Sequence, residues 1–277
     1  MLGFVYILVE GTPEEIKALE EAGDSPTLYK VGKAESRKLK PNAGQPFKPV
    51  EKRQSNVQSC NPRPVGILKL FCFGTGKEAS VAESAFHREF RKEHGLMIYE
   101  GHEWYRSSLP LERACTFLNA RSGTDVTHLF DRKRLTGTYE EGPAEFTGKP
   151  EVERSLNVYV FELRDEGRSW FRVLATSRDK RGIETWYNTG NPRKISMARK
   201  IRRPEASKLA EHNQRVRRLM AALRSRYEPL QSPWATKRGA GWNTLAWVLC
   251  DNFMSFFDDS VATILFSEYS KDNVRHH

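Results

Sequence analysis

The stretch Gly3-Phe4-Val5-Tyr6-Ile7-Leu8 and its counterpart Leu28-Tyr29-Lys30-Val31-Gly32 decide the fold of the N-terminal part of the chain. Both are short runs rich in β-branched and aromatic residues, so each predicts a strand. Between them, Thr12-Pro13-x-Glu15 has the pattern of a capping box with proline in the first turn, which predicts a helix ending near Ala22. We therefore expect an α+β unit in which a helix interrupts the first strand pair.

The next segments predict alternating loop, helix and strand. Residues 33–49 are rich in Lys, Pro, Gly and Asn and predict a loop, with Gly32 ending the second strand. Residues 50–59 predict a short helix that contains Arg53, and residues 65–73 predict a largely apolar strand.

A helix expected over residues 78–94 has an apolar stripe, formed by Ala79, Ala82, Phe86 and Phe90. Glu83 and His87 lie beside that stripe. A carboxylate partly withdrawn from water is costly without a compensating cation or donor. We therefore expect Arg53, a lysine or a metal ion within reach of Glu83.

These residues, taken in order, resemble the GIY-YIG nuclease superfamily, and most closely its phage and meiotically-up-regulated-gene branch. The resemblance covers residues 3–106 only. The matching elements are Val5-Tyr6-Ile7, Lys30-Val31-Gly32, Arg53 with Asn61-Pro62, Ala82-Glu83 with His87, and Glu103-Trp104-Tyr105.

The resemblance implies a small domain with a central antiparallel three-stranded sheet flanked by helices, and a catalytic site for cutting DNA. It implies that Glu83 binds one Mg²⁺ or Mn²⁺ ion, a hard cation that takes oxygen ligands and stabilises charge on phosphate. Arg53 would bind the same phosphate. Tyr6 would orient or deprotonate the attacking water, and Lys30 would contact the phosphate or that water.

The chain departs from the usual superfamily pattern at three places. Lys30 stands where the name-giving motif has tyrosine, although lysine is usual in this branch. The gap of 24 positions from Tyr6 to Lys30 fits an inserted helix, and Val57 stands where some members have His or Tyr. His87 could act as a base, bind phosphate or be a structural histidine, so the general base stays open. Glu103 could hold a water or close the module.

Composition limits the broad class of protein. The chain has 277 residues, 38% of them hydrophobic and 11% aromatic, which favours two globular domains with buried cores. No apolar run approaches the length of a membrane span, and the start of the chain does not resemble a signal peptide. Four widely spaced cysteines predict neither a zinc ribbon nor a disulfide framework. We expect a soluble protein with reduced thiols in the cytoplasm, either nucleoid-associated or in a host cell if phage-encoded, without membrane contact.

The positive charge is concentrated in one segment. Residues 191–226 contain twelve Lys and Arg against two acidic residues, and this excess equals the net charge of +10. Such a segment suits contact with a phosphate backbone, whereas the competing interpretation is a solvated linker. The nucleic-acid-binding candidates are Arg193, Lys194, Arg199, Lys200, Arg202 and Arg203, with Arg215 and Arg218 on the helix that follows.

The C-terminal half predicts a second α+β domain. We expect a nuclease-like domain at residues 1–122, a linker at 123–154 and a basic domain at 155–277. The runs at 156–163, 170–176 and 183–187 predict a β-meander, and residues 204–227 predict an amphipathic helix. The apolar segment 242–266 predicts a buried helix pair or a homo-oligomer contact. The alternative for this half is a structural domain with a basic surface.

Two functional hypotheses follow. In the first, the chain is a metal-dependent DNA endonuclease that hydrolyses phosphodiester bonds, with its C-terminal basic domain holding the DNA. In the alternative, the nuclease fold has become a non-catalytic module that binds DNA or protein. The combination of Tyr6, Arg53 and Glu83 favours the first.

Overall fold

The computed structural model of the protein has an α+β fold with two antiparallel sheets, which confirms the predicted class. The chain divides into two compact units, Met1–Tyr139 with Tyr187–Arg193, and Glu140–Trp186 with Lys194–His277. The structure describes residues 2–26, 28–35, 47–92, 104–106, 108–130, 156–176, 183, 187, 190, 191, 193–201, 209–227 and 244–265.

The first unit is built around a five-stranded sheet in the order β4-β2-β1-β3-β5. Its central strand β1 pairs antiparallel with β2 on one side and β3 on the other. The predicted sheet of three strands is therefore wrong in its number of strands, because β4 and β5 pair with the outer edges of β2 and β3. The strands are β1 (Gly3–Glu10), β2 (Leu28–Glu35), β3 (Val65–Phe73), β4 (Trp104–Arg106) and β5 (Thr124–Asp125).

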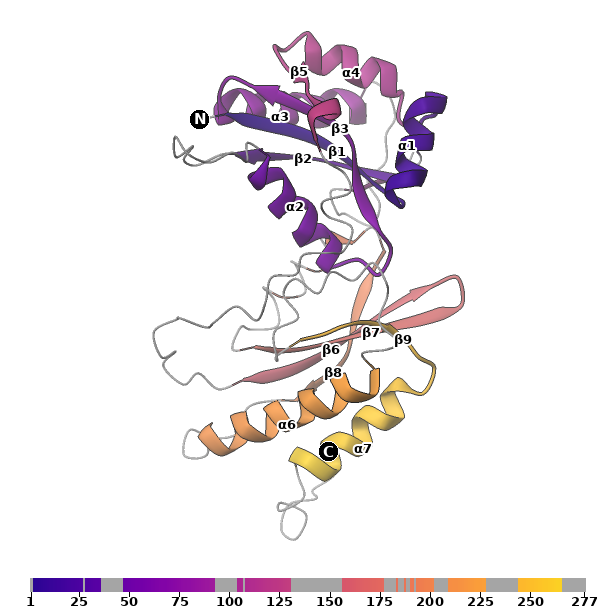
Figure 1. Ribbon diagram of the computed structural model, residues 1–277, viewed down its shortest axis with the longest axis vertical. Helices are drawn as coiled ribbons and strands as arrows, with labels where there is room; N and C mark the ends of the chain where they lie inside the picture. Colours follow the sequence, from indigo (N-terminus) through magenta and orange to yellow (C-terminus); the bar gives the residue numbers. More distant parts are fainter. Residues whose placement is uncertain are drawn as a thin grey trace. The chain divides into compact units, whose positions relative to one another are not determined.

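Helices cover both faces of this sheet (Figure 1). Helices α3 and α4 share one face, and α2 lies against the other. The helical elements are α1 (Pro13–Ala22), α2 (Lys48–Ser59), α3 (Gly76–Lys92), α4 (Leu111–Asn119) and the 3-10 helix η1 (Thr127–Leu129).

Local capping explains where two of the helices begin. In α1, the Thr12 hydroxyl accepts from the Glu15 amide at 3.2 Å while the Glu15 carboxylate accepts from the Thr12 amide at 2.7 Å, so the predicted capping box is confirmed. Thr75 and Glu78 make the same reciprocal pair at the start of α3. Each box satisfies amides that the first helical turn leaves without partners.

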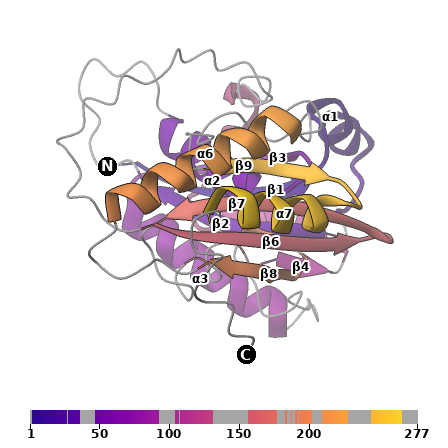
Figure 2. The same ribbon diagram turned by 90° about the horizontal axis from the view of Figure 1, so that it is seen from below.

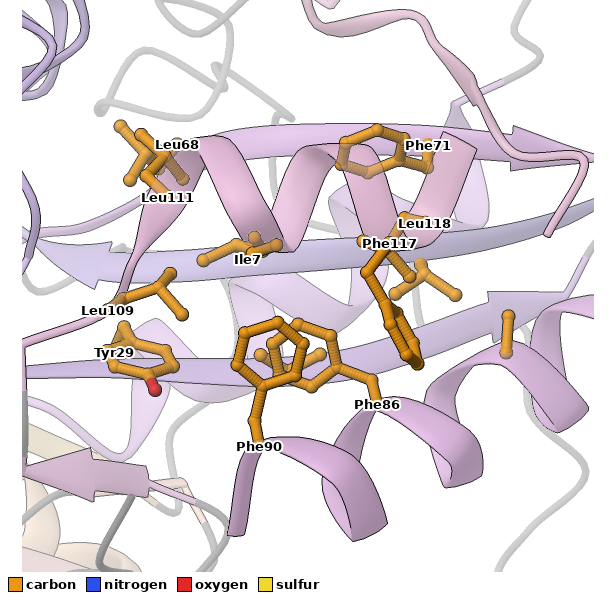
Figure 3. Packing of buried hydrophobic residues seen from close by; sticks show 14 of the residues in the cluster. Ile7, Tyr29, Leu68, Phe71, Phe86, Phe90, Leu109, Leu111, Phe117 and Leu118 are labelled. Atoms are coloured by element: carbon orange, nitrogen blue, oxygen red, sulfur yellow. The ribbon is translucent and has the colours of Figure 1, made fainter. Parts of the chain in front are cut away.

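Side-chain alternation along β1 divides the first unit into two cores. Val5 and Ile7 face α3 and α4, whose Phe86, Phe90 and Phe117 stack and interlock over the sheet (Figure 3). Phe4, Tyr6 and Leu8 point to the opposite face, toward α2. Burial of each such Phe or Leu side chain contributes about 2 kcal/mol. The alternation therefore fixes which helix meets which face.

The second unit is a four-stranded sheet in the order β8-β6-β7-β9, with two helices on one face (Figure 2). Strands β6 and β7 form a hairpin whose turn residues, Glu166 and Gly167, both have positive φ, as a two-residue type I′ turn requires. The elements are β6 (Asn157–Asp165), β7 (Arg168–Thr176), β8 (Ile195–Ile201), α6 (Leu209–Tyr227), β9 (Thr244–Leu249) and α7 (Phe253–Leu265).

Several predicted elements of the second half need correction. The third strand is β8, inside the basic segment, and it pairs with β6 rather than continuing a meander. Ile183 and Tyr187, the described residues of the strand predicted at 183–187, are helical. The first part of the predicted helix pair is β9, because it pairs with β7 at the edge of the sheet. The helix-forming stretch 209–227 is confirmed, whereas residues 202–208 lie outside the described residues.

A short segment from late in the sequence belongs to the first unit. Asn191 is fully buried, and its side-chain amide donates to the Cys60 carbonyl at 2.7 Å. Gly190 lies so close to Cys60 that an added Cβ would be 2.6 Å from the Cys60 Cβ. Strand β5 and helix η1 also belong to this unit, so the first unit continues past residue 122 into the predicted linker. Residues 131–155 lie outside the described residues. No helix in the described ranges is both long and apolar enough to cross a bilayer.

Candidate functional site

Tyr6 lies over Gly32, directly across the β1–β2 pair. A Cβ added at Gly32 would be 2.6 Å from the Tyr6 hydroxyl oxygen, so only glycine lets the phenol approach the backbone of β2 this closely. The Tyr6 side chain and Lys30 are both buried, at 4% and 3% exposure. Both point to the face that α2 covers, because Lys30 pairs with Leu8 and shares its face.

Arg53 is exposed on the outer side of α2. The inner side of that helix is fixed by two glutamines that bind strand β3 and the turn before it. Gln54 donates to the Val65 carbonyl at 2.9 Å, and Gln58 accepts from the Val65 amide at 2.8 Å. Because α2 and α3 pack on opposite faces, the structure does not bring Arg53 to the same face as Glu83.

Glu83 is half-buried on α3, facing β2. Its carboxylate lies 3.9 Å from the ammonium of Lys33, with 18% of the Glu83 side chain and 34% of the Lys33 side chain exposed. The same ammonium contacts the hydroxyl of Ser80, one turn earlier on α3. The expected cation beside Glu83 is therefore a lysine, and it is Lys33.

His87 lies one turn further along α3 and meets strand β4. Its Nδ1 makes a hydrogen bond with the Tyr105 hydroxyl, and the two rings are stacked with centroids 5.7 Å apart. Tyr105 is fully buried and stacks on Tyr29, its partner across the β2–β4 pair, at 5.2 Å. Burial raises the pKa of Tyr29, with a smaller contribution from the adjacent Tyr105. The Arg91 guanidinium lies 5.9 Å from the centre of the Tyr105 ring.

Tyr6 and the Glu83–Lys33 pair contact β2 from opposite faces of the sheet, at the adjacent residues Gly32 and Lys33. Strand β4 pairs only with Leu28, Tyr29 and Lys30, so within the described residues β2 has no neighbour on that side from Val31 onward. In this part of β2 the Tyr6 hydroxyl lies against Gly32 from one face of the sheet, while Glu83 and Lys33 lie on the other. Gly32 and Lys33 are adjacent, so a ligand at this edge could reach both faces.

A single metal ion is compatible with the residues present. Within the described part of the chain, no group of three or more His, Cys, Asp or Glu side chains could hold a metal. Mg²⁺ does not need such a cage, because it keeps several waters and is often held by one or two carboxylates together with a substrate phosphate. The half-buried Glu83 carboxylate could supply that protein ligand, and the Lys33 ammonium beside it, 34% of whose side chain is exposed, could turn toward a phosphate. The ion would then stabilise charge developing on the phosphate oxygens.

The basic residues predicted to bind nucleic acid differ in their surroundings. Lys194 and Lys200 are exposed at strand β8, with the Lys200 ammonium 5.5 Å from the Tyr159 ring centre. Arg199 is exposed and makes two hydrogen bonds with Asp258, at 3.1 and 3.3 Å. Arg202 and Arg203 lie outside the described residues.

Of the remaining three arginines, two make ion pairs and one is exposed. The Arg193 guanidinium is mostly buried beside Glu10, in the first unit. Arg215 donates to the Glu211 carboxylate and to the Leu265 carbonyl, with only 12% of its side chain exposed. Arg218 is exposed on α6. The charge excess of the segment is therefore only partly available to a partner.

Two residues that contact Glu83 or His87, Lys33 and Tyr105, were not predicted as functional. Lys33 was assigned to a loop because of the polar composition that follows Gly32, but β2 continues to Glu35 because it pairs along the whole of β1. Tyr105 was expected to be a core residue, and it is one, but its hydroxyl also contacts His87. Glu103 lies outside the described residues. The strand alternation of Tyr29, Val31 and Lys33 was the signal that could have placed Lys33 facing α3.

Comparison of the chain with models of protein families, with curated proteins and with solved structures gives no match.

Proposed function

We propose that the protein is a metal-dependent DNA endonuclease of the GIY-YIG type. The observation that carries this proposal is the half-buried Glu83 carboxylate of α3 beside Lys33 of β2. A carboxylate for one hard cation and an ammonium for a phosphate are the two charges that single-ion phosphodiester hydrolysis needs in one place. Both belong to regular elements, Glu83 to helix α3 and Lys33 to strand β2, which favours a fixed geometry.

The remaining residues would act around that edge. Lys33 would hold a non-bridging oxygen of the scissile phosphate as a point charge. Tyr6 would act from the other face through its hydroxyl against Gly32. Arg53 and Lys30 have less direct roles, because Arg53 is exposed on the opposite face and Lys30 is buried. We assign Arg53 to binding DNA beside the site rather than to the reacting phosphate.

Two features support the GIY-YIG assignment. The order β2-β1-β3, with helices on both faces, agrees with the sheet that the resemblance implies. The ordered motifs lie on the corresponding elements, with Tyr6 on β1, Gly32 on β2 and Glu83 on α3.

The second unit would hold the DNA outside the cutting site. Lys194, Lys200 and Arg218 are exposed basic residues there. Exposed Lys and Arg neutralise backbone phosphates and release counterions without reading sequence. This contact would supply affinity rather than selectivity.

A non-catalytic module that binds DNA or protein is the second candidate. The observation that favours it is the separation of Arg53 from Glu83 by the sheet, together with the burial of Lys30. A chain that had lost catalysis could keep the fold and the basic surface while its polar residues became structural. Cleavage assays distinguish the two candidates.

The test is incubation of the purified chain with supercoiled plasmid and Mg²⁺ or Mn²⁺. The proposal predicts nicked or linear product with wild type and a loss of about 10²-fold or more with Glu83→Gln. Glu89→Gln is the matched control, because Glu89 lies on the same helix and is partly exposed. Absence of product under every condition, or equal activity of Glu83→Gln and wild type, would reject the nuclease.

A further inference from the structure

The Lys33 ammonium lies beside two residues of α3 that are one helical turn apart. It contacts the Ser80 hydroxyl, and it lies 3.9 Å from the Glu83 carboxylate. A separation of 3.9 Å is beyond the range of a hydrogen bond, so charge alone attracts this ammonium to the carboxylate. Ion pairs without a direct hydrogen bond are weaker than those that have one. The Lys33–Glu83 pair is therefore one that another cation can replace.

The Glu83 carboxylate is stabilised by a positive charge beside it. Only 18% of its side chain is exposed, so removing a neighbouring cation without a replacement is costly. The Lys33 ammonium supplies this charge in the structure, and a Mg²⁺ or Mn²⁺ ion bound to Glu83 would supply it too. Two positive charges beside one carboxylate repel each other. Binding of a metal ion by Glu83 and the ion pair with Lys33 therefore oppose one another.

The Lys33 side chain can leave Glu83 without a change in the backbone. The strand β2 is held at this point by its pairing with β1, where Lys33 lies opposite Val5. The side chain itself is 34% exposed, and its ammonium is at the end of a flexible four-carbon stem. A backbone phosphate of DNA offers such an ammonium a second negative charge, in place of the carboxylate.

We propose that Lys33 exchanges between Glu83 and DNA, and that this exchange couples metal binding to DNA binding. The proposal rests on the proposed nuclease function. In the DNA-free chain Lys33 neutralises Glu83 and lowers its affinity for a divalent cation. When a phosphate draws the ammonium away, Glu83 is left to bind the cation. Because such coupling is reciprocal, a bound cation in turn leaves Lys33 to bind phosphate. The site then binds its metal ion where a substrate is present.

The first test measures metal affinity directly and does not depend on cleavage. Electron paramagnetic resonance of unbound Mn²⁺ gives the Kd of the DNA-free chain. Lys33→Gln removes the charge and keeps an amide that can donate to the Ser80 hydroxyl. Lys77→Gln is the matched control, because Lys77 is exposed on α3 and its loss changes the net charge equally.

The expected result is a Kd for Mn²⁺ that is about 5-fold lower in Lys33→Gln than in Lys77→Gln. This gain should disappear when Lys33→Gln is combined with Glu83→Gln. Equal Kd values for the two single variants would overturn the proposal. So would a gain that persists without the Glu83 carboxylate, because the charge of Lys33 would then act on Mn²⁺ bound elsewhere.

The second test follows cleavage of a labelled duplex across a series of Mn²⁺ concentrations. Lys33→Gln should reach its half-maximal rate at a lower Mn²⁺ concentration than Lys77→Gln. Its maximal rate should be about 10-fold lower, since the ammonium is also lost from the phosphate. An unchanged or higher half-maximal concentration would overturn the exchange. Cleavage that requires Glu83 but shows no gain in Mn²⁺ affinity in Lys33→Gln would reject the exchange and retain the nuclease. A gain in Mn²⁺ affinity without cleavage of any duplex would reject the nuclease and retain the competition at Glu83.

Discussion

The Arg193 guanidinium lies 2.6 Å from the Glu10 carboxylate, although the two residues are 183 positions apart in the chain. Glu10 ends the central strand β1, and Arg193 follows the buried Asn191 that binds the Cys60 carbonyl. Only 15% and 12% of the two side chains are exposed. This pair therefore joins the late segment to the first sheet, and it uses one of the arginines expected to contact DNA.

Removal of the Arg193 charge should destabilise the protein. Arg193→Gln leaves the mostly buried Glu10 carboxylate without its cation, so the free energy of unfolding should fall by about 2 kcal/mol, less than for a fully buried pair. Chemical denaturation of the full chain measures this loss. Lys194→Gln is the control, because Lys194 is the next residue and is exposed. Equal effects of the two substitutions would contradict a structural role for the pair.

A side chain at Gly32 should disturb Tyr6. In Gly32→Ala the new Cβ would meet the Tyr6 hydroxyl at 2.6 Å and its ring carbon at 2.8 Å, so the phenol must move within a packed core. Overpacking of this kind costs about 1–3 kcal/mol. Gly74→Ala is the comparison, because its nearest neighbour is the end of the Glu78 side chain at 3.1 Å. Thermal or chemical denaturation that ranks Gly74→Ala as the more damaging would contradict the packing described for Tyr6.

Two arginines of α6 should differ in their effects on DNA binding. Arg218 is exposed, so Arg218→Ala should reduce the slope of log affinity against log salt by about 0.9 if the residue contacts one phosphate. Arg215 is held by Glu211 and the Leu265 carbonyl, so Arg215→Ala should leave that slope unchanged. Fluorescence anisotropy across a salt series provides both slopes. The reverse order would show that the ion pair of Arg215 opens to bind DNA.

The Cys115 thiol should react slowly at moderately alkaline pH. Burial raises the pKa of Cys115 to about 11, against a smaller lowering by Lys69. Because the thiolate is the nucleophile, its alkylation by iodoacetamide should keep accelerating up to about pH 11 rather than levelling off near pH 9. Lys69→Met removes the lowering influence and should slow the reaction further at pH 9. Mass spectrometry of the modified peptide follows the rate, and a plateau near pH 9 would contradict the burial of Cys115.

The raised pKa of Cys115 also makes the free energy of unfolding depend on pH, in a defined direction. A thiol whose pKa is raised in the folded state stabilises the fold while it is protonated. That contribution is present below the ordinary thiol pKa of 9.0 and is lost as the pH rises through about 11.

Local signals predicted much of the first unit. The capping box at Thr12 and Glu15 depends on residues three apart, and the β3 boundaries follow an apolar run, so both are readable from sequence. The Glu83 environment was predictable in kind, as a carboxylate with a cation nearby, because the apolar stripe of α3 requires partial burial. The identity of that cation was not, since it depends on how far β2 pairs along β1.

Contacts between distant elements explain what the sequence left open. Residues 195–201 are polar for a strand, and they form β8 because β6 offers an edge to pair with. The His87–Tyr105 contact depends on β4 pairing with β2 through Tyr29. Arg53 and Glu83 lie on opposite faces because α2 packs on one set of alternating β1 side chains and α3 on the other. The alternation is visible in the sequence, but it was not used to assign each helix to a face.

The most direct test of the nuclease proposal measures cutting and binding on one substrate. A fluorescently labelled duplex is incubated with wild type or Glu83→Gln in Mn²⁺, and cleavage is followed on denaturing gels while anisotropy reports affinity. The proposal predicts cleavage by wild type, loss of cleavage in Glu83→Gln, and the same affinity for both proteins at a fixed salt concentration. Binding by wild type without cleavage of any duplex or supercoiled substrate would contradict it and would identify the chain as a binding module.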